Sequence, residues 1–144
     1  MNAFTYRFIL YPLRETYRKI LRPKTKGVKV MVRFHDEILL IKNTYGKRHL
    51  WTLPGGGVNR KESLSEAAKR EIREEVGIKL RDLKKLGIVQ EKKDTKHIFL
   101  SRVENKNQRI DKNEIKEAKW FALKSMPKTE EQTYSLQESL KLLK

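Results

Sequence analysis

The chain has 144 residues, and its 34 Lys and Arg outnumber its 18 Asp and Glu, which gives a formal net charge of +16 and a pI near 10.1. Its length and its 38% of hydrophobic residues suffice for one core, so we expect a single compact domain. The lack of cysteine excludes disulfides, thiolate nucleophiles and cysteine-based metal centres and suits a cytoplasmic protein, and no apolar run is long enough for an integral membrane segment.

The positive charge favours partners that carry phosphate, whether a nucleotide, RNA or an anionic membrane surface, and it does not choose among them. A coat of Lys and Arg that keeps the protein soluble explains the same composition equally well. The basic residues are spread along the whole chain, and no nucleic-acid recognition module is evident. Both facts weaken the case for a dedicated RNA surface.

Residues 1–26 are apolar, aromatic and basic, and we predict that they form a helical extension added to a catalytic domain that spans residues 27–144. A break is expected at Pro12, followed by apolar residues at helical spacing: Leu13, Tyr17, Ile20 and Leu21. Pro23 then ends the segment. Its composition suits packing on the domain, contact with a second subunit in a homodimer, or contact with an anionic surface.

From Gly27 the pattern changes to period two, with valines on one side at positions 28, 30 and 32, which predicts a half-buried strand. Its partner is expected over residues 37–42, across a turn at His35 and Asp36. A basic loop at 45–49 leads to a short strand at 50–53, which Pro54 and three glycines end.

A helix is predicted over residues 63–76, because Ser63 and Glu66 have the spacing of a capping box and Gly77 is a natural C-terminal stop. Further strands are expected at 84–90, 97–103 and 117–123. A C-terminal amphipathic helix is marked by Leu136, Leu140 and Leu143.

The predicted helix carries Glu71, Glu74 and Glu75 on one face, beside the apolar face that must turn to the core. A solvated helix with ion pairs explains Glu66 and Arg70, but the pair Glu71 and Glu75 would repel at their four-residue spacing. A hard divalent cation with oxygen ligands would remove that repulsion. We therefore favour a metal site over the solvated helix.

Glycines 55–57 allow a carbonyl to turn toward a metal and amides toward phosphate oxygens. Together with the helix they give one spaced pattern: Gly56, five residues, Glu62, seven residues, then Arg70 to Ile78 with the sequence REIREEVGI. The whole 23-residue pattern resembles the Nudix box, with every fixed position filled. The resemblance implies an α/β fold, an α/β/α sandwich with a mixed central sheet.

The resemblance also implies a hydrolase that uses Mg²⁺ or Mn²⁺ to cleave a phosphoanhydride bond in a nucleoside diphosphate linked to another group, by water attack on phosphorus. Four residues would hold the metal: the Gly56 carbonyl, Glu71, Glu74 and Glu75. Arg70 would orient the acidic cluster and Glu62 would support the loop.

The sequence leaves the identity of the general base open. Glu71 is the first candidate and Glu114 the second, while Glu117 has a plain alternative as a strand residue paired with a lysine. The basic loop 59–61 is either solvated or in contact with a substrate phosphate.

The substrate is also open, because the chain lacks the post-box proline associated with ADP-ribose-specific members and shows no coenzyme A signature. Residues that are able to stack on a base are Tyr45, His49, Trp51 and Phe121, of which the last two are better explained as core residues. Three functions compete: a pyrophosphatase for small nucleotides, a hydrolase for RNA 5′ ends or dinucleotide polyphosphates, and a non-catalytic nucleotide-sensing module.

Overall fold

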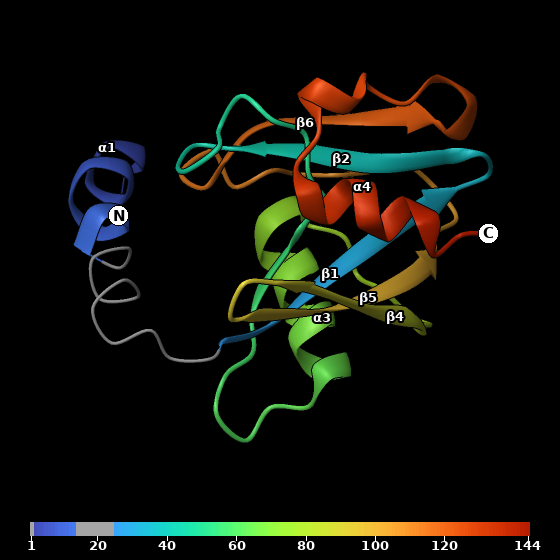
Figure 1. Cartoon of the computed structure of the whole chain (residues 1–144), viewed down its shortest axis with the longest axis horizontal. Coiled ribbons are helices and arrows are strands. Elements are labelled where there is room, and N and C mark those ends of the chain that lie inside the picture. Colours follow the sequence, from blue (N-terminus) through green and yellow to red (C-terminus); the bar gives the residue numbers. More distant parts are fainter. Residues whose placement is uncertain (1, 14–24) are drawn as a thin grey trace.

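A six-stranded mixed sheet forms the centre of the structure, a computed structural model that describes residues 2–13 and 25–144 (Figure 1). The strands are β1 (Thr25–Phe34), β2 (Glu37–Asn43), β3 (Gly55–Gly57), β4 (Lys84–Glu91), β5 (Asp94–Arg102) and β6 (Ile115–Ala122). Their order is β4-β5-β1-β2-β6, with β3 paired to the beginning of β1. The pairing of β1 with β5 is parallel and the other strand pairings are antiparallel.

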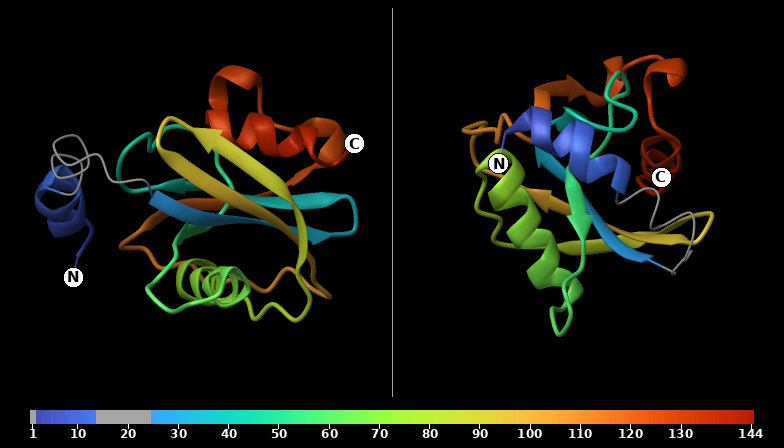
Figure 2. Two further views of the ribbon diagram at one scale, coloured as in Figure 1. Left: turned by 60° about the horizontal axis from the view of Figure 1, so that its bottom comes forward. Right: turned by 90° about the vertical axis from the view of Figure 1, so that its left-hand side faces the viewer.

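Two helices cover the two faces of this sheet: α3 (Leu64–Val76) on one side and α4 (Tyr134–Lys141) on the other (Figure 2). Each helix packs on its own apolar cluster, since Ile72 and Val76 join one buried group and Leu136 joins the other. Short 3₁₀ turns at Leu123–Ser125 and Thr129–Glu131 lead from β6 to α4. The α/β/α sandwich with a mixed sheet is confirmed.

Strand β1 corrects one expectation, because it is buried on both faces instead of one. Val28, Val30 and Val32 lie in the cluster under α3, while Met31 on the opposite side is fully buried under α4. A central strand covered by helices on both faces loses the polar side that a half-buried strand shows. The strand also begins at Thr25, two residues before the predicted start.

Helix α3 forms as its sequence predicts. The Ser63 side chain accepts a hydrogen bond from the Glu66 amide, and the Glu66 carboxylate accepts one from the Ser63 amide, which completes the capping box. Gly77 ends the helix with a left-handed φ of 69°. These caps fix the ends of the helix and therefore the positions of its carboxylates.

The segment that follows residue 50 differs from prediction. Residues 51 and 52 form only isolated bridges, Trp51 with Gln132 and Thr52 with Ile41. The glycines expected to end a strand form β3 themselves, by pairing with residues 27–29 of β1. Because these three glycines have no side chains, helix α3 approaches strand β3 closely.

The three later strands are confirmed with shifts of at most three residues at their ends, and the C-terminal helix is confirmed as α4. Leu136 is fully buried, and Leu140 and Leu143 pack against the same cluster, Leu143 from just beyond the helix end.

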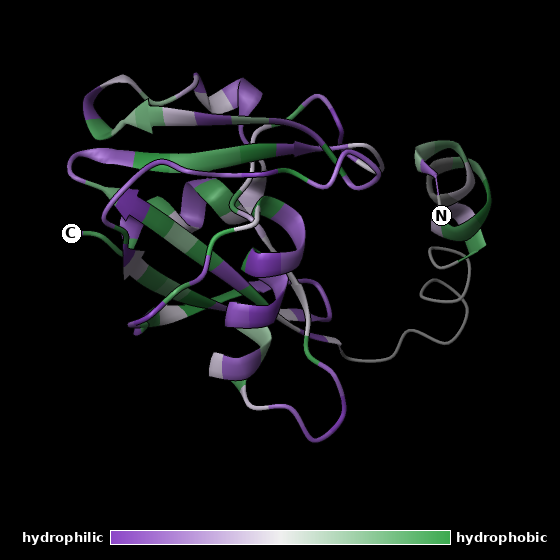
Figure 3. Cartoon of the chain, turned by 180° about the vertical axis from the view of Figure 1, so that it is seen from behind, coloured by the Kyte–Doolittle hydropathy of each residue, from purple (hydrophilic) through white to green (hydrophobic). Residues whose placement is uncertain are grey.

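The N-terminal helix (residues 3–13) begins at Ala3 and lies beside the domain. Within the described residues it continues through Pro12 to Leu13, and π-helical turns at Tyr6–Leu10 precede the proline. Of the predicted helical positions after Pro12, only Leu13 lies within the described residues; Tyr17, Ile20 and Leu21 lie outside them. The helix is largely hydrophobic, in contrast to the hydrophilic outer side of α3 (Figure 3). No helix in the described part of the chain is long and apolar enough to cross a membrane.

Candidate active site

The carboxylate of Glu71 lies directly beside the backbone of Gly56. A Cβ atom on Gly56 would be 2.5 Å from Oε1 of Glu71, so the carboxylate occupies the space of the missing side chain. The Gly56 carbonyl oxygen borders β1, 3.2 Å from the position of a Cβ on Gly27. The pairing of β3 with β1 and the caps of α3 together create this close approach.

Glu75 lies one helical turn further along and is only 2% exposed. Its Oε2 accepts a hydrogen bond from the Gly55 amide at 3.2 Å. Burial raises the pKa of this carboxyl well above 4.5, and the nearby charges of Glu71 and Glu114 raise it further, while Lys29 opposes the shift. A buried carboxyl beside two other carboxylates favours either a proton or a cation.

Lys29 is a site residue that the sequence analysis missed. Its Nζ donates a hydrogen bond to the Leu53 carbonyl at 3.0 Å, and burial lowers its pKa to about 8 although Glu75 lies nearby. In the sequence, Lys29 stands between two valines of a predicted strand, on the side that was expected to face solvent. Its position can be recognised as unusual only when both faces of β1 are known to be covered.

Arg70 connects the acidic residues to the loop. Its Nε and Nη2 donate to the two oxygens of Glu62 at 2.7 and 2.9 Å, and Nη2 also donates to the Gly57 carbonyl at 2.9 Å. Its Nη1 donates to Glu71 at 2.9 Å. The hydrogen bonds from Arg70 hold the pKa of Glu62 at about 2. Glu62 is therefore ionised, and it fixes the guanidinium that orients Glu71.

Glu74 lies apart from the other two carboxylates. Its side chain is 56% exposed, and its contact within the cluster is a hydrogen bond from Arg70 Nη1 at 3.3 Å. Among residues 2–13 and 25–144, no three His, Asp or Glu side chains are grouped closely enough to hold one ion. The structure thus brings Glu71 and Glu75 to the glycine strand and leaves Glu74 turned toward solvent.

The two later glutamates have different surroundings. The Glu114 carbonyl accepts a hydrogen bond from the Thr44 amide at 2.9 Å, and its carboxylate is near enough to Glu75 to raise the pKa of that group. Glu117 instead pairs with Lys42 at 3.9 Å across β2 and β6, as its plain alternative predicts. Glu114 is the later glutamate that lies near the acidic cluster.

The four residues considered for stacking on a base differ in their surroundings. Trp51 is buried and meets Phe121 edge to face at 4.8 Å, so both are core residues. Tyr45 contacts Tyr11 of the N-terminal helix, and His49 is exposed. In the basic loop, the Asn59 amide donates to Glu62, while residues 60 and 61 are exposed.

The donors around β3 fit a hard divalent cation. They are carboxylate and carbonyl oxygens, the type of ligand that Mg²⁺ and Mn²⁺ take. Glu75 is buried with a raised pKa, and Glu71 fills the space that a glycine leaves open for it. A cation bound there would stabilise the two negative charges that the fold brings together.

Comparison with known proteins agrees with this arrangement. The model of the NUDIX domain matches residues 23–141. The chain is 36% identical over 106 residues to the putative 8-oxo-dGTP diphosphatase of Bacillus subtilis (strain 168), which covers 72% of this chain and 70% of that protein. It is 40% identical over 63 residues to diphosphoinositol polyphosphate phosphohydrolase 3-alpha of Mus musculus, covering 43% of this chain but only 37% of that protein.

Among solved structures, the MutT NUDIX hydrolase from Burkholderia pseudomallei is similar, with a TM-score of 0.76 and 26% identity over 83% of this chain and 98% of that one. The NUDIX hydrolase from Nitrosomonas europaea shares the fold, with a TM-score of 0.72 and 20% identity over 84% of this chain and 88% of that one.

Proposed function

This chain belongs to the NUDIX family and is a Nudix hydrolase, and we propose that it cleaves a phosphoanhydride bond in a nucleoside diphosphate linked to another group, with a divalent metal ion. The observation that carries this proposal is the position of the Glu71 carboxylate against Gly56, next to the buried Glu75. In an ordinary solvated helix, two carboxylates at this position would be unfavourable, because burying a charge without a partner costs free energy.

Glu71, Glu75 and the Gly56 carbonyl would hold Mg²⁺ or Mn²⁺, and Glu74 would join them if its exposed side chain turned inward. When bound, the cation offsets the charge of the pyrophosphate and acidifies the attacking water.

The chain's own residues would orient the metal-binding carboxylates and accept the proton of the attacking water. Arg70, held by both oxygens of Glu62, keeps Glu71 in place. Glu71 is our first candidate to accept the proton of the attacking water, and Glu114 is the second, since its carboxylate lies near Glu75. Lys29, close to Glu75, would balance part of the negative charge when no cation is bound.

A panel of nucleoside diphosphate derivatives, incubated with Mg²⁺ or Mn²⁺ in ¹⁸O-labelled water, tests this function. We expect turnover that needs the metal and places the label on a phosphate product. Glu75→Gln should abolish turnover under the same conditions. Metal-independent turnover, or label in a non-phosphate product, would contradict the proposal.

A more highly phosphorylated substrate is the second candidate, namely an RNA 5′ end or a dinucleotide polyphosphate. The net charge of +16 favours it, because each added phosphate gains attraction from the basic surface. Adding these compounds to the panel at two salt concentrations discriminates the candidates. A preference for them that falls steeply with salt would support the second one.

A further inference from the structure

A hollow of about 520 Å³ lies between the N-terminal helix and the domain. Its lining residues are Ala3, Phe4, Phe8, Thr44, Arg48 and Lys116. The first three come from the helix, and the others come from β6 and from the loop after β2. This volume is in the range of pockets that bind small molecules.

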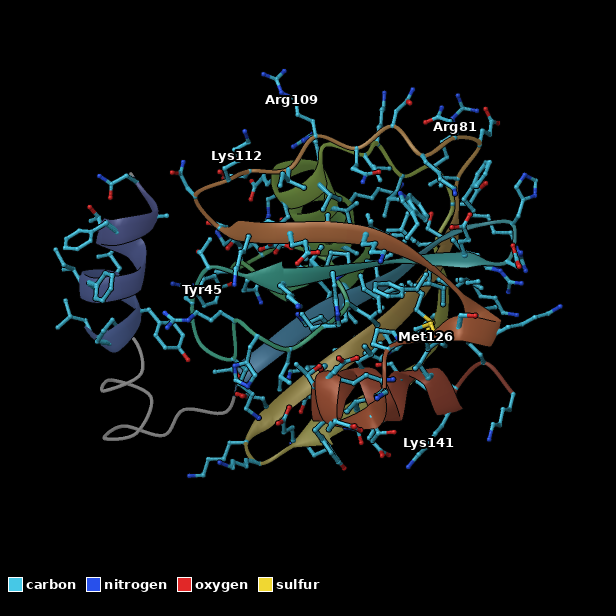
Figure 4. All side chains as sticks on the ribbon, turned by 90° about the horizontal axis from the view of Figure 1, so that it is seen from above. Tyr45, Arg81, Arg109, Lys112, Met126 and Lys141 are labelled. Atoms are coloured by element: carbon cyan, nitrogen blue, oxygen red, sulfur yellow. The ribbon has the colours of Figure 1, made fainter. Side chains whose placement is uncertain are left out.

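The helix is held at this place by tyrosine contacts. The rings of Tyr11 and Tyr45 have centroids 5.3 Å apart. The Tyr11 hydroxyl also lies so close to Gly46 that a Cβ there would be 2.9 Å from it. Figure 4 shows Tyr45 on the side of the domain that faces the N-terminal helix. The hollow is therefore bounded by a docked helix.

The two walls of the hollow differ in chemistry. On the helix side, the rings of Phe4 and Phe8 lie 4.8 Å apart and remain 63% and 55% exposed. On the domain side, Arg48 and Lys116 form no ion pair with any residue in the described ranges 2–13 and 25–144. An aromatic wall opposite two cations suits a ligand with a flat ring and a negative charge.

The hollow also borders the loop that carries Glu114. Thr44, which lines it, donates from its amide to the Glu114 carbonyl at 2.9 Å and from its hydroxyl to the Asn113 carbonyl at 2.8 Å. A ligand in the hollow thus lies next to the loop that carries the second candidate base.

We propose that this hollow binds the nucleoside monophosphate half of the substrate, with the base against Phe4 and Phe8 and a phosphate against Arg48 and Lys116. The inference rests on the proposed function, because the hollow borders the loop that carries Glu114, the second candidate base. It gives the N-terminal helix, expected from the sequence to be an addition to the catalytic domain, a direct part in binding.

Binding without turnover tests this directly. The full-length, metal-free protein is titrated with the four ribonucleoside monophosphates and, separately, with inorganic pyrophosphate, which has no base. Phe4→Leu with Phe8→Leu keeps apolar volume but removes the aromatic faces, and it should weaken nucleoside monophosphate binding about fivefold or more while leaving pyrophosphate binding unchanged. Ile9→Ala, an exposed neighbour that does not line the hollow, is the matched control.

The cationic wall has its own pair of variants. Arg48→Gln should weaken binding of nucleoside monophosphate about tenfold, whereas Lys47→Gln removes the same charge from the adjacent exposed position and should not. If no nucleoside monophosphate binds, or if each variant equals its control, the hollow is not a nucleotide site.

Kinetics separate this inference from the proposed function. With any substrate that the wild type hydrolyses, the Phe and Arg48 variants should raise KM and leave kcat within about twofold, because they touch binding and not the reacting atoms. An unchanged KM overturns the hollow as a substrate site and leaves the hydrolase proposal standing. A wild type that hydrolyses no derivative overturns the hydrolase proposal itself.

Discussion

The Glu71 carboxylate and Gly56 share one space, since a side chain on Gly56 would begin 2.5 Å from the carboxylate oxygen. The residue type at position 56 and the position of the proposed metal ligand are therefore coupled. A methyl group at position 56 and the present rotamer of Glu71 exclude each other.

The first prediction concerns Gly56→Ala. The new methyl meets only the flexible end of Glu71, so the fold should persist while the carboxylate moves aside. Turnover should fall by about 10²-fold, the scale of a catalytic group displaced by about 1 Å. Gly57→Ala is the control, because a Cβ there meets nothing within 4 Å. Equal turnover and equal melting temperatures in the two variants would disprove the coupling.

The second prediction separates the two candidate bases. Glu71→Gln should keep the fold and lower turnover by about 10²-fold or more, because a near-isosteric amide neither accepts a proton nor holds a cation well. Glu114→Gln is assayed beside it at saturating Mn²⁺ from pH 6 to 10, so that weak metal binding is not mistaken for loss of the base. If Glu114→Gln is the more damaged variant, the base is Glu114.

The third prediction concerns how metal affinity depends on pH. Because burial raises the pKa of Glu75, the proton and the metal compete for this carboxylate, and lowering the pH below that pKa should weaken binding by up to about tenfold per unit. Lys29, with a pKa of about 8, repels a cation while it is protonated, so affinity should keep rising through that pH. Calorimetric titration of Mg²⁺ or Mn²⁺ measures both effects. An affinity that does not change with pH in the wild type would refute the competition between proton and metal. In the Glu75→Gln variant, metal binding should be weaker by about tenfold or more.

The fourth prediction concerns the pair of Glu62 with Arg70. The folded pKa of Glu62 is about 2 against an ordinary value of 4.5, so its stabilisation is fully present above pH 4.5 and is lost as the pH falls toward 2. The free energy of unfolding of Glu62→Gln should lie below that of the wild type at neutral pH and approach it near pH 2. Glu130→Gln, at an exposed position, controls for the change in net charge. Parallel curves for wild type and Glu62→Gln down to pH 2 would show that the pair does not stabilise the fold.

Local signals in the sequence were enough to predict α3 and its carboxylates. Ser63, Glu66 and Gly77 act within a few residues of each helix end, so their spacing alone defines it. The same spacing correctly located Arg70 between Glu62 and Glu71, because all three lie on one loop and helix.

Features that depend on tertiary packing could not be predicted in this way. Glycines 55–57 form a strand only because β1 offers an edge. Lys29 lies half-buried beside the Leu53 carbonyl and near Glu75, residues that only the fold brings to it. The outward turn of Glu74 is also invisible on a helical wheel, which gives the direction of a Cβ atom but not the rotamer beyond it.

The parallel pairing of β1 with β5 bears on how the protein folds. Thr25 pairs with Asp94, so the chain must close a loop that contains β2, β3 and all of α3 before this central pair of strands is complete. Such non-local contacts cost chain entropy before they contribute stability, which slows folding. Because β3 is held at the edge of β1, the Glu71 carboxylate meets Gly56 only after β1 has found its place. We therefore expect refolding to restore the helical circular dichroism signal before it restores metal affinity, and partly folded chains to have no hydrolytic activity.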